Sequence, residues 1–152
     1  MDKTDVKLLK LTQDGIPITH SPFKVLAAEL GISEQEVVDR LKSLQKAGKI
    51  RRFAASIGHR AIGITANAMC VWNVPDDRIE KTGALMAEFP EVTHCYERPR
   101  YPDWPYNLFT MVHSYTSEDC EKVAIRISEA TGIKDYTLFF SEREFKKTGV
   151  RL

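Results

Sequence analysis

The sequence predicts an α+β protein made of two small domains. Residues 1–53 show helical periodicity broken by glycine and proline, whereas residues from 65 onward show the period-two alternation of strands. This second region runs strand, helix, strand, strand, helix, strand, which is the order of a ferredoxin-like βαββαβ domain. We therefore expect an N-terminal winged helix-turn-helix domain over residues 1–62 and a ferredoxin-like domain over residues 63–152.

Two helices open the first domain. Apolar residues near the N-terminus form one face of a short helix that ends toward Gly15. Ser21 is a good capping residue and precedes Pro22, a residue suited to the first helical position. Gly31 then marks the end of the second helix.

A third helix and a basic wing complete this domain. Ser33 and Glu36 have the S-x-x-E spacing of a capping box, and apolar residues recur at helical spacing until Gly48. Residues 49–53 mix basic and apolar side chains, which predicts a short wing strand. Two helices joined by a glycine-containing turn and followed by a wing are typical of a winged helix-turn-helix.

Alternation and stop signals define the elements of the second domain. In its first strand the apolar residues Ala66, Ala68, Cys70, Trp72 and Val74 alternate onto one face. The predicted strands are residues 65–74, 92–98, 106–114 and 136–140, and the predicted helices are residues 76–89 and 117–131.

Composition limits the classes of function. The content of 43% hydrophobic and 28% charged residues is typical of a globular protein. No apolar run approaches the roughly 18 residues of a membrane span, and the N-terminus lacks the pattern of a secretory signal. Cys70, Cys95 and Cys120 have no metal-binding spacing, so we expect free thiols, no metal site, no membrane contact and a cytoplasmic location.

The charge of the first domain suggests nucleic acid, but its third helix argues against it. Residues 1–62 hold eleven Lys and Arg against seven Asp and Glu, a net charge of +4. The third helix, however, begins with Glu34 and Glu36 and carries Asp39, where carboxylates would meet bases and phosphates. We therefore do not expect tight DNA binding.

An unusual mixture of side chains lies between residues 94 and 113. It joins two imidazoles and two guanidiniums with polar aromatic rings and an amide, which suits a large, flat, anionic ligand. On the strand at residues 92–98, alternation predicts Val92, His94, Tyr96 and Arg98 on one face and Thr93, Cys95 and Glu97 on the other. We expect the first face to be a pocket wall.

Four segments carry a resemblance to a known family. Residues 27–33 (AAELGIS) and 40–50 (RLKSLQKAGKI) resemble the Lrp/AsnC family of regulators. Residues 94–99 (HCYERP) and 103–113 (DWPYNLFTMVH) are more specific, and they resemble the siroheme decarboxylase branch of that family. The resemblance covers the whole chain.

The resemblance implies a carboxy-lyase that removes carboxyl groups from the two acetate side chains of siroheme, giving didecarboxysiroheme in haem biosynthesis. It also implies a beta-type subunit that pairs with a related alpha-type subunit, and no cofactor beyond the iron that siroheme carries. A His-Tyr-Asn-Leu-Trp motif of the family reads Pro105-Tyr-Asn-Leu-Phe109 here, so this chain would need its partner or another histidine for that role. The alternative is a transcription regulator that senses a tetrapyrrole or an amino acid.

Chemistry selects the expected catalytic residues. Loss of carbon dioxide from a pyrrole acetate leaves carbanion-like charge on the methylene, and an acid must then protonate it. We expect His94 to be the proton donor or to lie beside the iron, Tyr96 to donate or orient, and Arg98 to bind a carboxylate. The structural alternatives are a strand histidine bonded to a carbonyl and a tyrosine packed on the sheet.

The expected substrate-binding residues come from three places. One group lies in the proline-rich connection after residue 98, one histidine lies on the following strand, and a basic cluster that also includes His59 and Arg60 lies at the wing. For the strand histidine the alternative is a core or interface role, and for the wing it is a solvated surface. The set is Arg51, Arg52, Arg100, Trp104, Tyr106, Asn107 and His113.

Overall fold

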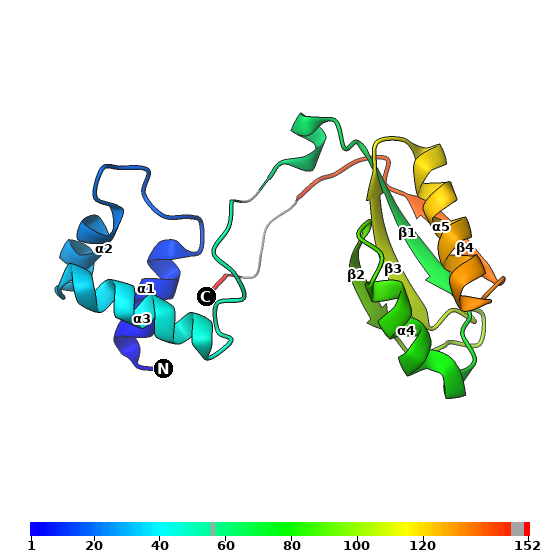
Figure 1. Ribbon diagram of the computed structural model, residues 1–152, viewed down its shortest axis with the longest axis horizontal. Helices are drawn as coiled ribbons and strands as arrows, with labels where there is room; N and C mark the ends of the chain where they lie inside the picture. Colours follow the sequence, from blue (N-terminus) through cyan, green and yellow to red (C-terminus); the bar gives the residue numbers. More distant parts are fainter. Residues whose placement is uncertain (56, 147–150) are drawn as a thin grey trace. The chain divides into compact units, whose positions relative to one another are not determined.

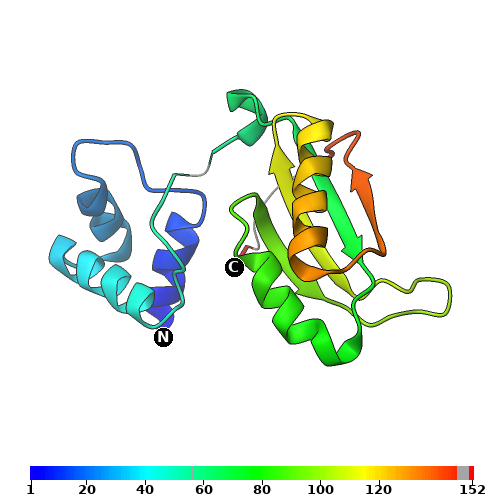
Figure 2. The same cartoon turned by 45° about the vertical axis from the view of Figure 1, so that its right-hand side comes forward.

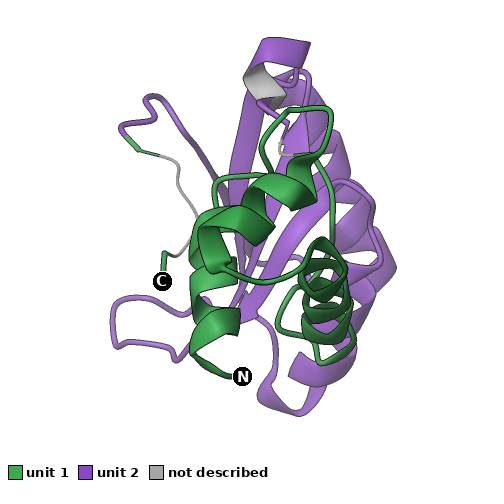
Figure 3. Cartoon of the chain, turned by 90° about the vertical axis from the view of Figure 1, so that its left-hand side faces the viewer, with its two compact units in different colours: residues 1–56, 146–152 green, residues 57–145 purple. Residues whose placement is uncertain are grey.

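The chain forms two compact units. The computed structural model describes residues 1–55, 57–146 and 151–152. Contacts group residues 1–56 with 146–152 in one unit and residues 57–145 in the other (Figures 1 and 3). The sequence placed the division between residues 62 and 63 and put the C-terminal residues in the second domain. Each unit has its own apolar core.

Three helices build the first unit: α1 (Lys3–Thr12), α2 (Pro22–Leu30) and α3 (Glu34–Lys46). The predicted end of α2 is confirmed, because Gly31 has a φ of 68° and its N–H donates to the Ala27 carbonyl. A left-handed residue at this position favours glycine. The buried side chains of the three helices are Leu8, Leu26, Ala27, Val37, Leu41 and Leu44.

The helix caps differ in part from the prediction. Ser33 does accept a hydrogen bond from the Glu36 N–H, but the Glu36 carboxylate binds Arg40 instead of completing a capping box. Ser21 makes no capping bond with its side chain. The complete capping box lies on α1, where Asp2 and Asp5 each accept from the other's backbone N–H. The S-x-x-E pattern misses it because both members are aspartates.

The predicted wing strand at residues 49–53 is wrong, because the structure has no strand there. The backbone N–H groups of Lys49 and Ile50 both donate to the Leu44 carbonyl, at 2.9 and 3.2 Å. These donors close the end of α3, so they cannot form a β ladder. The described part of this unit also contains no second strand to pair with.

The second unit has the predicted βαββαβ order. Its elements are β1 (Ala66–Trp72), α4 (Ile79–Ala87), β2 (Val92–Glu97), β3 (Leu108–Ser114), α5 (Ser117–Thr131) and β4 (Tyr136–Phe140). The antiparallel sheet has the strand order β2-β3-β1-β4, which confirms the ferredoxin-like fold. Short 3₁₀ turns cover His59–Ile62 (η1) and Asp76–Arg78 (η2), so α4 is shorter than the predicted helix 76–89.

Both helices of this unit pack on the same face of the sheet (Figure 2). On β1 the side chains of Ala68, Cys70 and Trp72 are buried beneath them, which confirms the predicted alternation. The indole N–H of Trp72 donates to Thr110 Oγ1 at 2.9 Å, so the one polar group of this large core side chain has a hydrogen-bond partner. Among the described residues no helix is long and apolar enough to span a membrane.

No described helix of this unit covers the opposite face of the sheet, which we call the open face. Strand register assigns its residues, because directly paired residues point to the same side. The open face comprises Asn67, Met69 and Val71 of β1, His94 and Tyr96 of β2, Phe109, Met111 and His113 of β3, and Thr137 and Phe139 of β4.

Candidate functional site

A β-bulge decides which residues of β2 reach the open face. Val92 pairs with Val112, but His94 pairs with Met111, so Thr93 is an extra residue in β2. The bulge reverses the alternation at this point. Val92 therefore packs toward the helices while His94 lies on the open face, and the prediction that they share a face is wrong.

The three predicted catalytic residues do lie together. The rings of His94 and Tyr96 are 5.9 Å apart between centroids. The Arg98 guanidinium lies over the ring of Phe109, 5.1 Å from its centroid, and so belongs to the same face. All three side chains are exposed. Among the described residues Arg98 forms no ion pair, so its charge faces an aromatic surface without a carboxylate.

One hydroxyl connects two histidines of the open face. Thr93 Oγ1 lies 3.0 Å from His94 Nδ1, 3.1 Å from His113 Nδ1 and 3.3 Å from the Met111 carbonyl oxygen. The sequence placed Thr93 on the opposite face from His94, because strict alternation does not allow for a bulge. The structure thus adds Thr93 to the candidate site and brings His113 next to His94.

Trp104 and Tyr106 close one end of the open face. The Trp104 ring stacks on Phe139 of β4 with 5.9 Å between centroids and meets the Tyr106 ring edge-on at 5.2 Å. The Tyr106 hydroxyl lies 3.1 Å from Thr137 Oγ1. Two of the predicted substrate-binding rings are therefore held against the last strand.

Arg100 and Asn107 are instead used by the fold. Arg100 forms an ion pair with Asp76 and donates to the carbonyls of Val74 and Pro105. Asn107 is 3% exposed and bonds both the N–H and the carbonyl of Val74, each at 2.9 Å. These contacts fix the connection between β2 and β3, and they leave neither side chain directed to the open face.

Arg51 and Arg52 belong to the first unit. Arg52 and Lys49 contribute to the lining of a cavity of about 770 Å³, whose walls come from that unit. Arg51 is exposed. The side chains of His59 and Arg60, which the sequence grouped with them, lie outside the described residues. The cavity contains none of the open-face residues.

The open face also holds an unsatisfied acceptor. Asn67 Oδ1 is buried and has no hydrogen-bond partner within the part of the chain that the structure describes. Asn67 is paired across the ladder with His113, so this oxygen lies on the same side of the sheet as the two imidazoles. A buried acceptor without a donor costs free energy, so it is suited to a donor from a bound molecule or a second chain.

The three cysteines are not suited to act as nucleophiles. Burial raises the pKa of Cys70 to about 12 and also raises the pKa of Cys95 and of Cys120. The Cys95 thiol donates to the Gly83 carbonyl on the helix side of the sheet. All three thiols therefore stay protonated at neutral pH. Among the described residues no group of three His, Cys, Asp or Glu is arranged to hold a metal ion.

The chemistry of the open face suits a flat ligand with carboxylates. Met69, Phe109, Met111 and Phe139 provide an apolar surface, and the imidazoles and one guanidinium lie on or beside it. The residues of the open face include no carboxylate, since Glu97 pairs with Leu108 and points to the helix side. An apolar wall with a few convergent polar groups is the usual composition of a ligand site.

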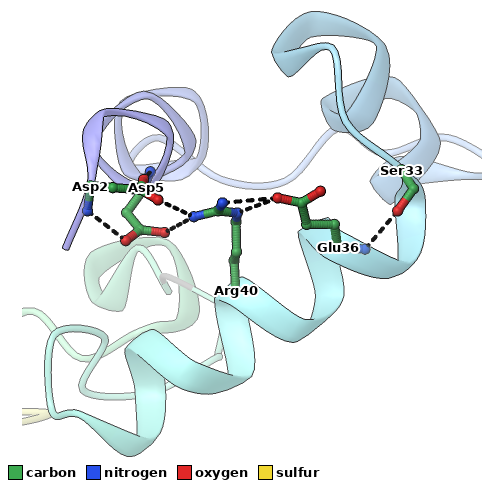
Figure 4. Close-up of polar contacts among 5 residues, drawn as sticks. All are labelled: Asp2, Asp5, Ser33, Glu36 and Arg40. Carbon is green, nitrogen blue, oxygen red and sulfur yellow. Dashed lines mark hydrogen bonds and ion pairs between the residues drawn. The ribbon is translucent and has the colours of Figure 1, made fainter.

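Arg40, one of the cationic residues of the third helix, is differently placed. The Arg40 guanidinium lies 2.8 Å from carboxylate oxygens of Asp2, Asp5 and Glu36 (Figure 4). Backbone hydrogen bonds at the capping box, and then Arg40, lower the pKa of Asp2 and of Asp5. The guanidinium therefore joins α1 to α3 and is not directed outward to a phosphate.

Two family models match the chain. The model described as AsnC-like ligand binding domain matches residues 61–146. The model described as siroheme decarboxylase NirDL-like HTH domain matches residues 5–51. The first match falls on the second unit, with its ferredoxin-like fold, and the second match falls on the three-helix unit.

Known proteins show the same relationship over the full length. The chain is 91% identical to the siroheme decarboxylase beta subunit of Methanosarcina barkeri (strain Fusaro / DSM 804), covering 100% of both chains. It is 40% identical to the siroheme decarboxylase NirH subunit of Paracoccus pantotrophus, covering 99% of this chain and 96% of that protein.

Solved structures agree with these relatives. The chain is similar to the crystal structure of the siroheme decarboxylase NirDL, with a TM-score of 0.69 and 36% identity, and it spans 47% of that longer chain. It matches the same protein in co-complex with an iron-uroporphyrin III analogue with a TM-score of 0.68. Escherichia coli AsnC, at 16% identity and a TM-score of 0.81, shares the fold.

Proposed function

This chain belongs to the siroheme decarboxylase family of AsnC-like proteins, and we propose that it is a beta-type subunit that decarboxylates the two acetate side chains of siroheme. The product would be didecarboxysiroheme, so the activity is that of a carboxy-lyase in haem biosynthesis. The open face carries the proposal, because it combines an apolar wall with imidazoles and a guanidinium and lacks carboxylates.

The residues of the open face have distinct proposed roles. Arg98, which has no ion-pair partner among the described residues, binds a substrate carboxylate through its two-pronged guanidinium. His94 donates the proton that replaces carbon dioxide on the methylene, and Tyr96 beside it orients that group. Trp104 and Tyr106 cover the edge of the macrocycle, and His113 lies on the same wall.

Of the seven residues in the predicted binding set, five keep a proposed role and two lose it. Arg51 and Arg52 remain proposed contacts for the propionates, on the strength of their charge and exposure. Arg100 and Asn107 are left out of the proposed site because their polar groups bind the connection between β2 and β3.

An alpha-type subunit completes this proposal. The chain has Pro105 where a family motif has histidine, so the partner supplies a group that this chain lacks. The exposed rings of Tyr96 and Phe139 on the open face favour contact with a second chain, since no described helix of their own unit covers them. Siroheme brings its own iron, and the proposal requires no other cofactor. Three free thiols favour work in the reducing cytoplasm.

We also propose that the three-helix unit does not act by binding DNA. Its third helix begins with Glu34 and Glu36, and Arg40 is bound to carboxylates of this chain. A recognition helix brings its N-terminal residues to bases and phosphates, and the first turn of this one carries acids. A gel-shift titration against genomic fragments checks this point, and a shifted complex at nanomolar protein in physiological salt would contradict it.

Product mass tests the main proposal. The purified chain, alone and with its alpha-type partner, is incubated anaerobically with siroheme and the tetrapyrrole is analysed by mass spectrometry. We expect the paired proteins to remove two molecules of carbon dioxide. Unchanged siroheme in the paired sample would overturn the proposal.

A matched pair of histidine variants then tests the site. His94→Gln should lower kcat by about 100-fold or more, because general acid catalysis commonly contributes that much. His20→Gln, an exposed loop histidine of the other unit, should leave kcat unchanged. Equal rates in the two variants would move the proton donor away from β2.

A further inference from the structure

The bulge in β2 places a hydroxyl against one ring nitrogen of the proposed acid. Thr93 Oγ1 lies 3.0 Å from His94 Nδ1, 3.1 Å from His113 Nδ1 and 3.3 Å from the Met111 carbonyl oxygen. Because Thr93 is the extra residue of the bulge, its hydroxyl lies on the histidine side of the strand. The proposed decarboxylation assigns no role to this threonine.

The Met111 carbonyl decides where the hydroxyl proton lies. A carbonyl oxygen can only accept, so Thr93 Oγ1 donates its one proton to Met111. If that proton pointed to a ring instead, lone pairs of the two oxygens would oppose each other at 3.3 Å. The hydroxyl then has only its two lone pairs left for the rings, so it accepts from the Nδ1–H of His94 and the Nδ1–H of His113. The neutral His94 ring therefore carries its proton on Nδ1.

We propose that Thr93 is a positioning residue that holds a proton on His94 Nδ1 and so makes Nε2 the nitrogen that exchanges protons with the ligand. The His94 side chain is exposed, and its Nε2 makes no hydrogen bond among the described residues. The group that one ring nitrogen binds sets the tautomer of the ring and the role of the other nitrogen. A free neutral histidine carries its proton mainly on Nε2, so the Thr93 contact selects the less common tautomer.

The catalytic meaning of this contact rests on the proposed function. The acid is the charged His94 ring, which has a proton on both nitrogens. The bond from the methylene to the carboxylate carbon breaks, carbon dioxide leaves, and the electron pair stays on the methylene carbon. The Nε2 proton of His94 moves to that carbon, and the ring becomes neutral with its Nδ1 proton still bound to Thr93. Solvent then returns one proton to Nε2, which is the one proton that each decarboxylation consumes.

Nitrogen NMR of the full chain tests the tautomer without any substrate. The ring nitrogens are labelled, the His94 signals are assigned with His94→Gln, and spectra are recorded at a pH where the ring is neutral. We expect the proton on Nδ1 in the native chain and in Thr93→Ser, and mainly on Nε2 in Thr93→Val, which keeps the shape without the hydroxyl. The exposed His20 of the other unit is the internal reference and should not change. A proton mainly on Nε2 in the native chain, or an unchanged tautomer in Thr93→Val, would overturn the proposal.

Turnover by the paired subunits gives a second, independent readout. Thr93→Val should lower kcat about tenfold with little change in KM, because the acid is no longer held by its Nδ1, and this loss is part of the 100-fold or more that a general acid contributes. Thr93→Ser should keep most of the native rate. Equal kcat in all three proteins contradicts the positioning role. If the native pair does not decarboxylate siroheme, the proposed function fails, and the NMR result alone decides on the role of Thr93.

Discussion

Two arginines show how differently the two units use a positive charge. In the first unit Arg40 is bound by carboxylates of Asp2, Asp5 and Glu36, which come from α1, its cap and the first turn of α3 (Figure 4). In the second unit Arg98 lies on the ring of Phe109 and forms no ion pair with described residues. The first cation is neutralised within the fold, and the second has no carboxylate partner among the described residues.

The different surroundings of Arg40 and Arg98 suggest different roles for the two units. A helix-turn-helix that reads DNA needs outward cations, and here the central guanidinium of α3 has been turned toward α1. In the described part of the second unit Arg98 is not turned to a carboxylate in this way, although Arg100 and Arg126 each form an ion pair. The first unit thus uses its cation to hold two helices together, while the open face leaves one available for the proposed ligand chemistry, and each experiment below changes one side of this contrast.

Removing the presented charge should have the largest effect. Arg98→Ala should weaken porphyrin binding about ten- to 100-fold, because a charge-assisted hydrogen bond to a carboxylate is worth roughly 1.5–3 kcal/mol. The Kd is measured by absorption titration with siroheme. The control is Arg126→Ala, since Arg126 also lies over a ring, Phe89, but on the helix side of the sheet. Equal affinities in the two variants would show that Arg98 does not meet the ligand.

Removing the neutralised charge should instead affect stability. Arg40→Ala leaves Asp2, Asp5 and Glu36 close together without their common cation. We expect the melting temperature of the three-helix unit to fall by several degrees while porphyrin affinity stays the same. Lys42→Ala, on the exposed side of the same helix, is the control and should change neither quantity. A loss of porphyrin affinity in Arg40→Ala would contradict the idea that Arg40 serves stability alone.

Acid should weaken the same network. For both aspartates, the backbone hydrogen bond of the capping box and then Arg40 lower the pKa below its ordinary value of 3.8. A carboxyl whose pKa is lower in the folded than in the unfolded state stabilises the folded protein fully when the pH is above the unfolded pKa. This contribution is lost as the pH falls through the folded pKa. Thermal unfolding followed between about pH 6 and pH 2 should therefore show the three-helix unit losing stability toward the acid end. The double variant Asp2→Asn with Asp5→Asn should flatten that dependence, and an equally steep curve would contradict this assignment.

The same contrast shows what sequence patterns can and cannot predict. Element order, the glycine stop at Gly31 and the buried face of β1 follow from local periodicity, and all three are confirmed. The bulge at Thr93 and the use of Arg100 by its own loop depend on pairing between distant segments, which no local pattern contains. Alternation therefore grouped His94, Tyr96 and Arg98 correctly, but it misplaced their neighbour Thr93.

The smallest expected effect concerns the ring that carries the presented charge. Phe109→Leu removes the aromatic surface under Arg98, and an exposed cation–π contact is worth about 0.5–1 kcal/mol. Porphyrin affinity should therefore fall about two- to fivefold, because the guanidinium must be held in place by the ligand alone. Phe89→Leu is the matched control, since it removes the ring under Arg126 on the helix side. Any stability lost is measured separately by thermal unfolding. If Phe109→Leu bound siroheme as tightly as the native chain, the ring would only fill space, and the presentation of Arg98 would depend on the backbone pairing of Arg98 with Asn107 alone.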